Sequence, residues 1–259
     1  MAIAKSEALI LRVIPFRDTS KILTVYTAEQ GLVSLLAKGV RGPKPRHGAA
    51  LELFAVSDIV YYHRSGRDLQ LLSQALLLEP FLGLGSDLGR FAHASAVLEI
   101  LLRVLTGQEP PGRLYPLSVR TLECLETAPV GALPAVFRAF EIKAVSFLGH
   151  RPELDTCVEC GRTFDGYPGF AGLQGGVVCH DCVHGVDGAW RISPECLGYL
   201  RRLLRSPLVD LFVDPAPQPV QGEAARVLEM FLGLHIERYE PLRGLRLAET
   251  PRPRRVPAA

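Results

Sequence analysis

Four cysteines are the residues whose type and spacing point most directly to chemistry. Cys157 and Cys160 form one Cys-x-x-Cys pair, Cys179 and Cys182 form a second, and eighteen residues separate the pairs. Four thiolates at this spacing are typical of a tetrahedral zinc site in which each turn supplies two ligands. Glycines between the pairs provide turns for a zinc ribbon. The sequence therefore predicts one bound Zn²⁺.

All four positions of this zinc site are filled by protein, which favours a structural metal, because a catalytic zinc keeps one position open for water. Two disulfides, a redox dithiol, and a zinc-dependent hydrolase or deaminase are the other interpretations. The histidines beside the second pair, His180 and His184, are either alternative ligands or exposed turn residues. Cys124 and Cys196 stand alone on helical stripes and are expected to be buried apolar residues.

Charged residues are unevenly distributed along the 259 residues, whose formal net charge is +2. The net charge is +3 over residues 1–80, −1 over 81–156, −4 over 157–240 and +4 over 241–259. Two basic ends therefore flank an acidic middle. This asymmetry indicates an anionic partner for the ends, and it makes protein partners more suitable for the middle.

The N-terminal basic charge is concentrated in one segment. No acidic residue lies between Glu29 and Glu52, and prolines and glycines make the intervening stretch a loop with four cations, namely Lys38, Arg41, Lys44 and Arg46. Such a loop attracts phosphates. Further cations on neighbouring strands and hairpins extend the predicted patch: Arg12, Arg17, Lys21, Arg64 and Arg67. The alternative is a solvated loop without a partner.

Aromatic side chains near this basic segment are candidates for stacking on unpaired bases. Tyr61 and Tyr62 are adjacent on a predicted strand, so they point to opposite faces and only one of them needs to be in the core. The other tyrosine, together with Phe16, is a candidate stacking platform, although packing is the commoner role of such residues.

The elements that position these residues fall into two groups. Residues 5–79 read as five strands separated by turn signals, over 9–13, 22–27, 32–36, 51–62 and 69–78. Five strands in this length suit a small closed barrel, most often of the OB type, whose open face binds oligonucleotides. The chain is thus predicted to be an α+β multidomain protein that begins with an OB-type barrel.

After Pro80 the apolar spacing becomes helical. Helices are predicted over 91–105, 114–125, 136–147, 197–204 and 223–239, with Ser193-Pro194 as a helix start and Gly149 as a stop. The prolines in 214–221 predict a loop there. The predicted domains are the barrel at 1–80, a helical domain at 81–156 and 190–247, a zinc ribbon at 157–189, and a disordered tail at 248–259.

Sequence motifs for enzymes are missing. The chain contains no phosphate-binding GxxxxGK[ST], no GxGxxG after a strand, no HExxH and no GxSxG. We therefore expect a non-enzymatic protein with no small-molecule substrate. No segment resembles an export signal or a membrane span, so a cytoplasmic location is expected.

Several motifs together resemble the RecO family of DNA recombination mediators. They are Ala8-Leu9-Ile10-Leu11, Asp18-Thr-Ser-Lys21-Ile-Leu, Thr27-Ala-Glu-Gln-Gly31, Ala37-Lys38-Gly39, Ala50-Leu51-Glu-Leu-Phe54 and Leu242-Arg-Gly-Leu-Arg246. The resemblance implies an OB barrel followed by a helical domain with a zinc-ribbon insertion. By position, it matches Lys38, Arg41, Lys44 and Arg46 to the family's basic stretch.

The same resemblance implies a function at the nucleoid. It implies binding to single- and double-stranded DNA, annealing of complementary strands, and, with RecR, loading of RecA onto DNA coated with single-strand-binding protein (SSB). It also implies that the helical domain binds the acidic C-terminal tail of SSB. Such a tail needs an apolar groove with a cation at its rim, for which Arg90 and Arg103 are candidates; the alternative is that both are surface residues of no special role. The alternative is a zinc-containing structural adaptor that acts by protein–protein contacts and binds little DNA itself.

Overall fold

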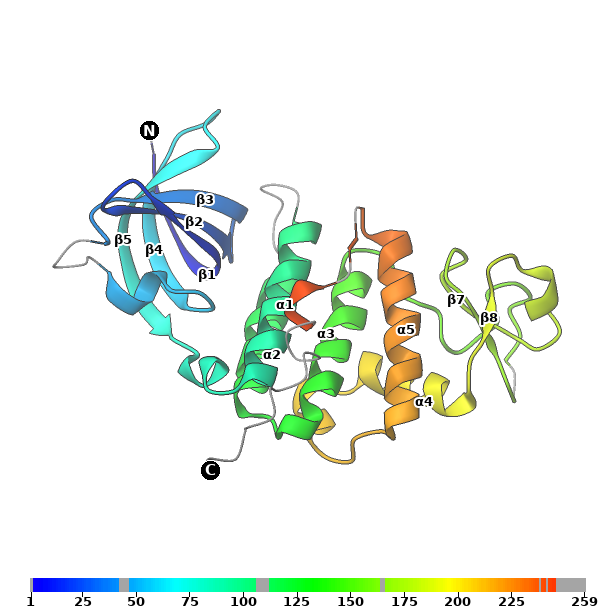
Figure 1. Cartoon of the computed structure of the whole chain (residues 1–259). Helices are drawn as coiled ribbons and strands as arrows, with labels where there is room; N and C mark the ends of the chain where they lie inside the picture. The colour runs from blue at the N-terminus through cyan, green and yellow to red at the C-terminus, as the bar shows by residue number, and fades with distance from the viewer. Residues whose placement is uncertain are drawn as a thin grey trace, which may run out of the picture.

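Three regions follow one another along the molecule in Figure 1: a β-barrel containing the N-terminus, a body of helices, and a small module at the far end. The computed structural model describes residues 2–41, 47–105, 112–163, 166–237, 239–240 and 242–245. The predicted contacts Lys44 and Arg46 and the predicted tail 248–259 lie outside the described residues. No described helix has both the length and the apolar character needed to span a membrane.

The barrel contains five strands, β1 (Ala2–Phe16), β2 (Ser20–Thr27), β3 (Gly31–Ala37), β4 (Val56–His63) and β5 (Leu69–Glu79). They close in the order β1-β2-β3-β5-β4, with β3 and β5 parallel and the other pairs antiparallel. This five-stranded closed arrangement confirms the predicted OB-type barrel. The long strand β1 closes the barrel because it pairs with both β2 and β4.

Alternation of buried and half-buried residues explains the strands. In β3 every second residue is buried, and Val33 and Leu35 contribute to the barrel core. The predicted strand over 51–62 starts later, at Val56, because Gly48–Leu51 forms a 3-10 helix that inserts Leu51 into the same core. Phe54 follows in a left-handed conformation with φ of 72°, which ends any extended path before β4.

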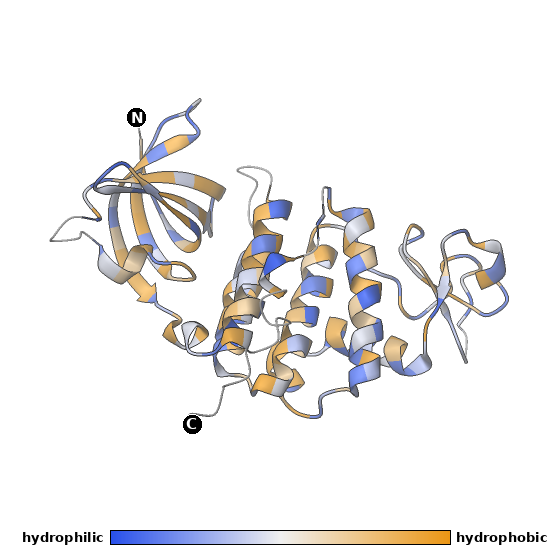
Figure 2. Cartoon of the chain, in the orientation of Figure 1, coloured by the Kyte–Doolittle hydropathy of each residue, from blue (hydrophilic) through white to orange (hydrophobic). Residues whose placement is uncertain are grey.

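The helical body contains α1 (Leu88–Val104), α2 (Leu114–Thr127), α3 (Leu133–Phe147), α4 (Pro194–Arg205) and α5 (Gln218–His235). Helix α3 packs against the other four helices and lies at the centre of the largest core. Figure 2 shows apolar residues along the barrel strands and along these helices.

Two of the predicted helix ends are confirmed and one helix start is wrong. The Ser193 hydroxyl accepts a hydrogen bond from the Cys196 N–H at 3.1 Å and caps α4. Gly149, with φ of 98°, follows the end of α3. The predicted loop over 214–221 overlaps α5, which begins at Gln218, because Pro219 lies in the first turn, where a missing N–H costs no helical hydrogen bond. Helix α5 also ends at His235, before the predicted residue 239.

The barrel and the helical body share one hydrophobic core. The Tyr26 and Tyr115 rings meet edge to face with centroids 5.3 Å apart, and the Phe54 and Phe91 rings do so at 5.6 Å. The Tyr115 hydroxyl donates to Glu7 Oε1 at 3.0 Å, and burial raises the pKa of this tyrosine. These contacts join β1, β2 and the segment that precedes β4 to α1 and α2.

The third region, the cysteine module (residues 153–191), contains β6 (Gly169–Ala171), β7 (Gly176–Val178) and β8 (Trp190–Arg191) in the order β7-β6-β8. The sheet extends beyond the predicted insertion at 157–189, since β8 pairs with β6 and Glu153 bridges to Gly176. A Cβ on Gly176 would lie 2.4 Å from the Glu153 carbonyl oxygen, so only glycine permits this close approach.

Candidate metal centre and nucleic-acid interface

The four cysteine thiols converge at one point of the cysteine module. Their Sγ atoms all lie within 4.8 Å of one another. Four sulfurs about 2.3 Å from a tetrahedral zinc lie about 3.8 Å apart, and the Cys160 and Cys179 Sγ atoms are 3.9 Å apart. His180 and His184 are not part of this group. The donor set therefore fits one tetrahedral metal ion.

Electrostatics around the thiols favour a bound cation. The Arg162 side chain donates to Cys160 Sγ at 3.5 Å and lowers the pKa of this thiol to about 6. Burial opposes ionisation of Cys157, but backbone N–H donors, including that of Cys179 at 3.3 Å, outweigh burial and lower the pKa of Cys157. By contrast, hydrogen bonding to Cys179 raises the pKa of Cys182. Four thiolates this close repel one another, so full ionisation requires a cation between them.

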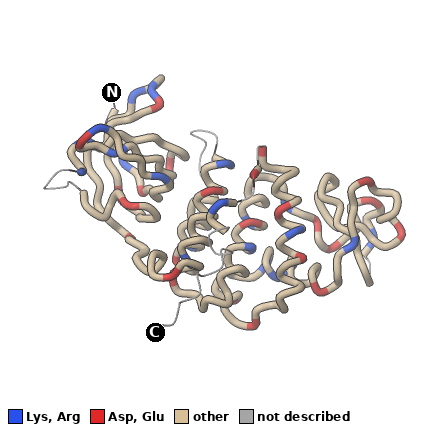
Figure 3. Tube along the Cα trace, viewed as in Figure 1, with Lys and Arg blue, Asp and Glu red and all other residues tan. Residues whose placement is uncertain are grey.

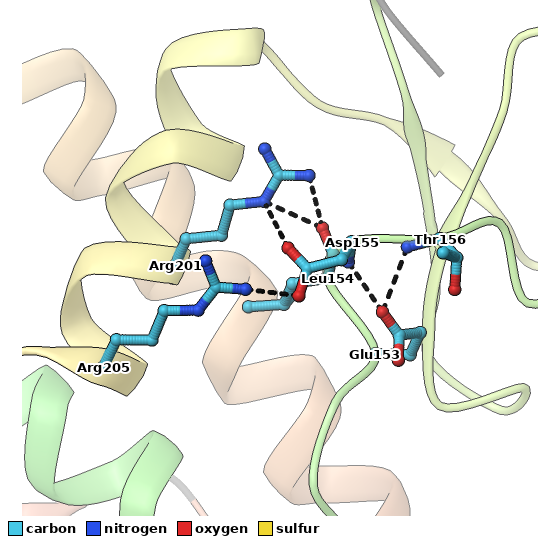
Figure 4. Close-up of polar contacts among 6 residues, drawn as sticks. All are labelled: Glu153, Leu154, Asp155, Thr156, Arg201 and Arg205. Atoms are coloured by element: carbon cyan, nitrogen blue, oxygen red, sulfur yellow. Dashed lines mark hydrogen bonds and ion pairs between the residues drawn. The ribbon is translucent and has the colours of Figure 1, made fainter. Parts of the chain in front are cut away.

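Figure 4 shows how the chain entering the metal site is joined to α4. The Asp155 carboxylate forms ion pairs with Arg201, whose Nε is 3.3 Å away, and with Arg205 on the same helix face. Arg201 also donates to the Leu154 carbonyl from Nε at 2.9 Å and from Nη2 at 2.7 Å. These contacts fix the start of the cysteine module on the helical body.

Glu153 stabilises the adjoining turn. Its Oε1 accepts hydrogen bonds from the N–H groups of Asp155 at 2.7 Å and Thr156 at 3.0 Å, and these bonds lower the pKa of Glu153. The β6–β7 hairpin packs on α5, where His235 Nε2 lies 3.0 Å from the Gly172 carbonyl. The module is therefore fixed to both α4 and α5.

A groove of about 570 Å³ lies on the barrel where β3, β4 and β5 meet, and we call it the barrel groove. Its floor is apolar and contains Leu36, Tyr62, Leu69 and Leu71. Its rim carries the cations Lys38, Arg64 and Arg67 together with Asp68. Figure 3 shows basic segments at this end of the molecule. The combination suits a ligand with flat apolar groups and a charged backbone.

Gln70 holds the hairpin that forms one side of the barrel groove. Its side chain is almost fully buried and accepts from the Arg64 N–H at 2.8 Å. It also donates to the carbonyls of Arg64 at 3.1 Å and Arg67 at 2.6 Å. Sequence reasoning missed this residue because it begins an apolar strand run. A glutamine directly after a turn, at an inward position, was the available signal.

Three of the predicted phosphate contacts come together beside the barrel groove. The Val40 and Arg41 N–H groups donate to the Thr19 carbonyl at 2.8 and 3.0 Å, and Arg41 Nη1 donates to the Arg17 carbonyl at 3.2 Å. These bonds join the β1–β2 turn to the segment after β3. Arg17, Lys38 and Arg41 are all exposed there.

Lys21 and Arg12 have different surroundings from these three residues. Lys21 Nζ forms an ion pair with Glu52 Oε1 at 2.8 Å, and its side chain is only 17% exposed. Arg12 lines a second groove, where β1 meets α1. Of the nine cations in the predicted patch, the seven that the structure describes therefore do not form one continuous patch.

The predicted division between the two adjacent tyrosines is confirmed. Tyr61 is fully buried and donates to Gln30 Oε1 at 2.5 Å, whereas Tyr62 lines the barrel groove. Phe16 is half-buried beneath the Arg17 guanidinium, 5.3 Å from its ring centroid, and does not line that groove. Cys124 and Cys196 are buried, as predicted.

The two cations considered for an acidic peptide tail both make intramolecular bonds. Arg90 Nη1 donates to the Leu125 carbonyl at 2.6 Å. Arg103 Nη1 donates to the Glu240 carbonyl at 2.5 Å, and its guanidinium lies over the Tyr239 ring. Arg103 borders the same groove that Arg12 lines.

Comparison with known families agrees with this architecture. Residues 1–81 match the family described as "Recombination protein O N terminal". Residues 85–245 match the family described as "Recombination protein O C terminal". The boundary between the two matches follows β5, so the first covers the barrel and the second covers the helical body with the cysteine module.

Curated relatives extend along most of the chain. A protein from Anaeromyxobacter dehalogenans is 33% identical over 91% of this chain and 92% of its own length. One from Rubrobacter xylanophilus is 35% identical over 81% and 84%, and one from Symbiobacterium thermophilum is 33% identical over 92% and 94%. All three are named "DNA repair protein RecO". Matches to both halves and to full-length relatives show that the chain belongs to the RecO family of DNA repair proteins.

Proposed function

We propose that this DNA repair protein is a recombination mediator that binds single-stranded DNA in the barrel groove and anneals complementary strands. The observation that supports this most is the groove itself, which combines an apolar floor including Tyr62 with the cations Lys38, Arg64 and Arg67. Bases stacked on an aromatic ring contribute about 1–3 kcal/mol each, and rim cations neutralise the phosphates. Double-stranded DNA is held by the same cations through its backbone.

Annealing by this surface requires no catalytic group. Cations screen the repulsion between two polyanions and keep complementary strands close, while base pairing supplies the free energy. We therefore propose a non-enzymatic protein without a small-molecule substrate. Because its substrate is chromosomal DNA, we expect it in the cytoplasm at the nucleoid.

The proposed metal is a single structural Zn²⁺ held by Cys157, Cys160, Cys179 and Cys182. Four sulfur donors at tetrahedral spacing favour zinc over harder cations such as Mg²⁺. The ion would hold together a module whose own apolar cluster is small. The hydrolase or deaminase alternative is not supported, because the four sulfurs fill a tetrahedral ion's coordination sphere and leave no position for water.

The proposed protein partners are RecR and SSB, together with which the chain would load RecA onto coated single strands. Resemblance to recombination mediators supports these partners. For the acidic SSB tail, Arg90 and Arg103 are both candidates on the helical body, and each already donates to a backbone carbonyl of this chain. Binding of an acidic tail peptide to Arg90→Ala and to Arg103→Ala, measured separately, would identify the cation by the variant that loses affinity.

The DNA proposal is tested by reversing charge beside the barrel groove. Lys38→Glu/Arg41→Glu should weaken binding of single-stranded DNA and reduce the slope of log K against log salt by about 1.4, since each lost phosphate contact removes about 0.7. The matched control is Arg113→Glu/Arg120→Glu, which changes net charge equally at two exposed positions of the α2 region. Gel shifts at several salt concentrations measure both. Equal losses in the two variants would refute the barrel-groove proposal.

A second measurement separates the mediator from an adaptor that acts only through protein contacts. Annealing of complementary oligonucleotides coated with SSB, without ATP, should be accelerated by the parent and not by Lys38→Glu/Arg41→Glu. An adaptor would give no annealing in either case. Gln70→Leu should have an intermediate effect, because it removes the amide that holds the Arg64–Arg67 hairpin.

A further inference from the structure

A second groove, of about 470 Å³, lies where the barrel meets the helical body, and we call it the junction groove. Its apolar walls come from both regions: Leu11 and Leu53 from the barrel side, Leu98 and Leu102 from α1. Three arginines line it, namely Arg12, Arg103 and Arg243. It shares no lining residue with the barrel groove.

Arg12 and Arg243 differ from Arg103 in having uncommitted guanidinium groups. Neither has a side-chain hydrogen bond or ion pair with any described residue, and both are exposed. Arg12 comes from β1 and Arg243 from the last described turn of the chain. Two free cations from distant parts of the sequence therefore meet at one groove.

The backbone that carries Arg243 is firmly held. Glu99 accepts hydrogen bonds from the N–H groups of Arg243 at 2.9 Å and Gly244 at 2.7 Å. A Cβ on Gly244 would lie 2.7 Å from the Ala92 carbonyl oxygen, so this turn lies directly on α1. Arg243 is thus positioned by the fold and is not simply part of a loose chain end.

The acidic residues at the junction groove do not cancel these cations. The Glu99 carboxylate is satisfied by the two N–H groups and by Arg103, whose Nη2 is 3.5 Å away. The remaining acidic side chain on the rim is that of Glu240. Beyond Leu245 the sequence adds four arginines and one glutamate, a net charge of +3.

We propose that the junction groove is a second nucleic-acid site, which takes the phosphate backbone of a single strand on Arg12 and Arg243 while the barrel groove holds another. This inference rests on the proposed DNA-binding function and extends it. Two independent sites on one chain would hold two strands at once, and bringing two strands together is what annealing requires. An acidic peptide is the competing occupant, but the basic sequence that follows favours a long polyanion.

The test uses the full chain and Arg12→Glu/Arg243→Glu. Because both side chains are exposed and unpaired, the variant should melt like the parent; Arg12→Gln/Arg243→Gln is the milder second variant. At low salt the parent should bind two oligothymidylates of about ten nucleotides per chain and the variant one. The annealing rate should fall by about tenfold, with the tighter oligonucleotide affinity unchanged.

The possible outcomes distinguish a failure of the junction-groove proposal from a failure of the barrel-groove proposal. If Lys38→Glu/Arg41→Glu leaves one bound oligonucleotide and Arg12→Glu/Arg243→Glu leaves the other, both sites stand. If the parent binds only one and the junction variant anneals normally, the junction proposal is wrong while the barrel groove stands. A third outcome would overturn the proposal. An acidic, apolar peptide would bind the parent without displacing DNA, and it would fail to bind Arg12→Glu/Arg243→Glu. The junction groove would then be a peptide site.

Glu240→Gln should strengthen binding at the junction groove, the opposite of the effect expected for the arginine variants. Removing this rim carboxylate should strengthen binding of the second oligonucleotide about twofold to tenfold at low salt, because a like charge no longer repels the phosphates. The effect should disappear at high salt. Weaker or unchanged binding of the second oligonucleotide at low salt would contradict the proposed path of the strand.

Discussion

The barrel strands are 7 to 15 residues long, whereas those of the cysteine module have two or three residues. The barrel closes its hydrogen-bonded ladder around large apolar side chains such as Tyr61, Leu35 and Ile59. The module has a cluster built largely from valine, alanine and the cysteines themselves. Apolar burial within the region therefore stabilises the barrel, whereas the module's own apolar cluster is small and its four cysteines could hold a metal ion.

The barrel and the cysteine module also differ in charge. Lys38, Arg17 and Arg41 project from the barrel, while the described part of the module carries acidic residues such as Glu159, Asp181 and Asp187. The barrel end suits a polyanion, and the module end repels one. The strand proposed to bind at the barrel would thus be directed away from the far end of the molecule.

Metal removal should have the largest effect, and it should destabilise the module far more than the barrel. Apparent zinc-binding free energies of about 10–16 kcal/mol in small zinc domains exceed what the module's apolar cluster contributes, so a chelator should unfold the module. Trp190, the chain's single tryptophan, lies in β8 and reports this through its fluorescence. Amide exchange in β1–β5 should stay slow, and added Zn²⁺ should restore the signal. A metal-free chain with native Trp190 fluorescence and slow exchange in β6 and β7 would contradict a structural metal.

A cavity in the barrel should produce the next largest effect. Leu35 is fully buried in the barrel core, and Leu35→Ala should lower the free energy of unfolding by about 2–5 kcal/mol. Leu76→Ala is the control, since Leu76 is 66% exposed on the same barrel. Urea unfolding followed by circular dichroism measures both, and zinc content should stay at one per chain in each. Similar losses from the two variants would mean that core packing does not control barrel stability.

The ion pairs of Asp155 should have a smaller effect. Asp155→Asn removes the charge that contacts Arg201 and Arg205, and because these groups are partly exposed, each pair contributes about 1 kcal/mol or less. The expected result is a slightly lower urea midpoint for the Trp190 transition, with DNA affinity unchanged. Asp187→Asn makes the same charge change at an exposed position of the module. If this control shifts the midpoint equally, the clamp to α4 contributes nothing.

The smallest expected effect on stability is that of Glu153, and it should depend on pH. Hydrogen bonds from two N–H groups lower its pKa below the ordinary value of 4.5, so its stabilising effect is complete above that value and is lost as pH falls through the lower, folded-state pKa. The difference in stability between the parent and Glu153→Gln should therefore shrink as pH is lowered from about 6 toward 4. A stability difference that grows as the pH falls would contradict a lowered pKa of Glu153 in the folded protein.

Features that depend on a few neighbouring residues were predictable from the sequence. The Ser193 cap and the Cys-x-x-Cys pairs are local patterns, and both appear in the structure as expected. The start of α5 was not predicted, because Pro219 reads as a helix breaker unless it is known to lie in the first turn. Local chemistry therefore identified the cysteine cluster and the helices, with errors at the helix ends.

Features that depend on distant segments were not predictable. Arg12 lines the junction groove only because β1 packs near α1, and Arg243 reaches the same groove because Glu99 and Gly244 hold the last described turn on α1. Lys21 pairs with Glu52, 31 residues away in the sequence, and no local pattern indicates that partner. Such contacts are set by the packing of segments far apart in sequence, which no local pattern reports.

The double pairing of β1 has a consequence for synthesis of the chain. Strand β1 leaves the ribosome before both of its partners: its second half pairs with β2, but its beginning pairs with the much later β4, where Ala2 lies opposite His63. Strand β3 must likewise wait for β5, its parallel neighbour. Contacts this distant in sequence close slowly, so the nascent β1 keeps an open, aggregation-prone edge until the whole barrel has emerged.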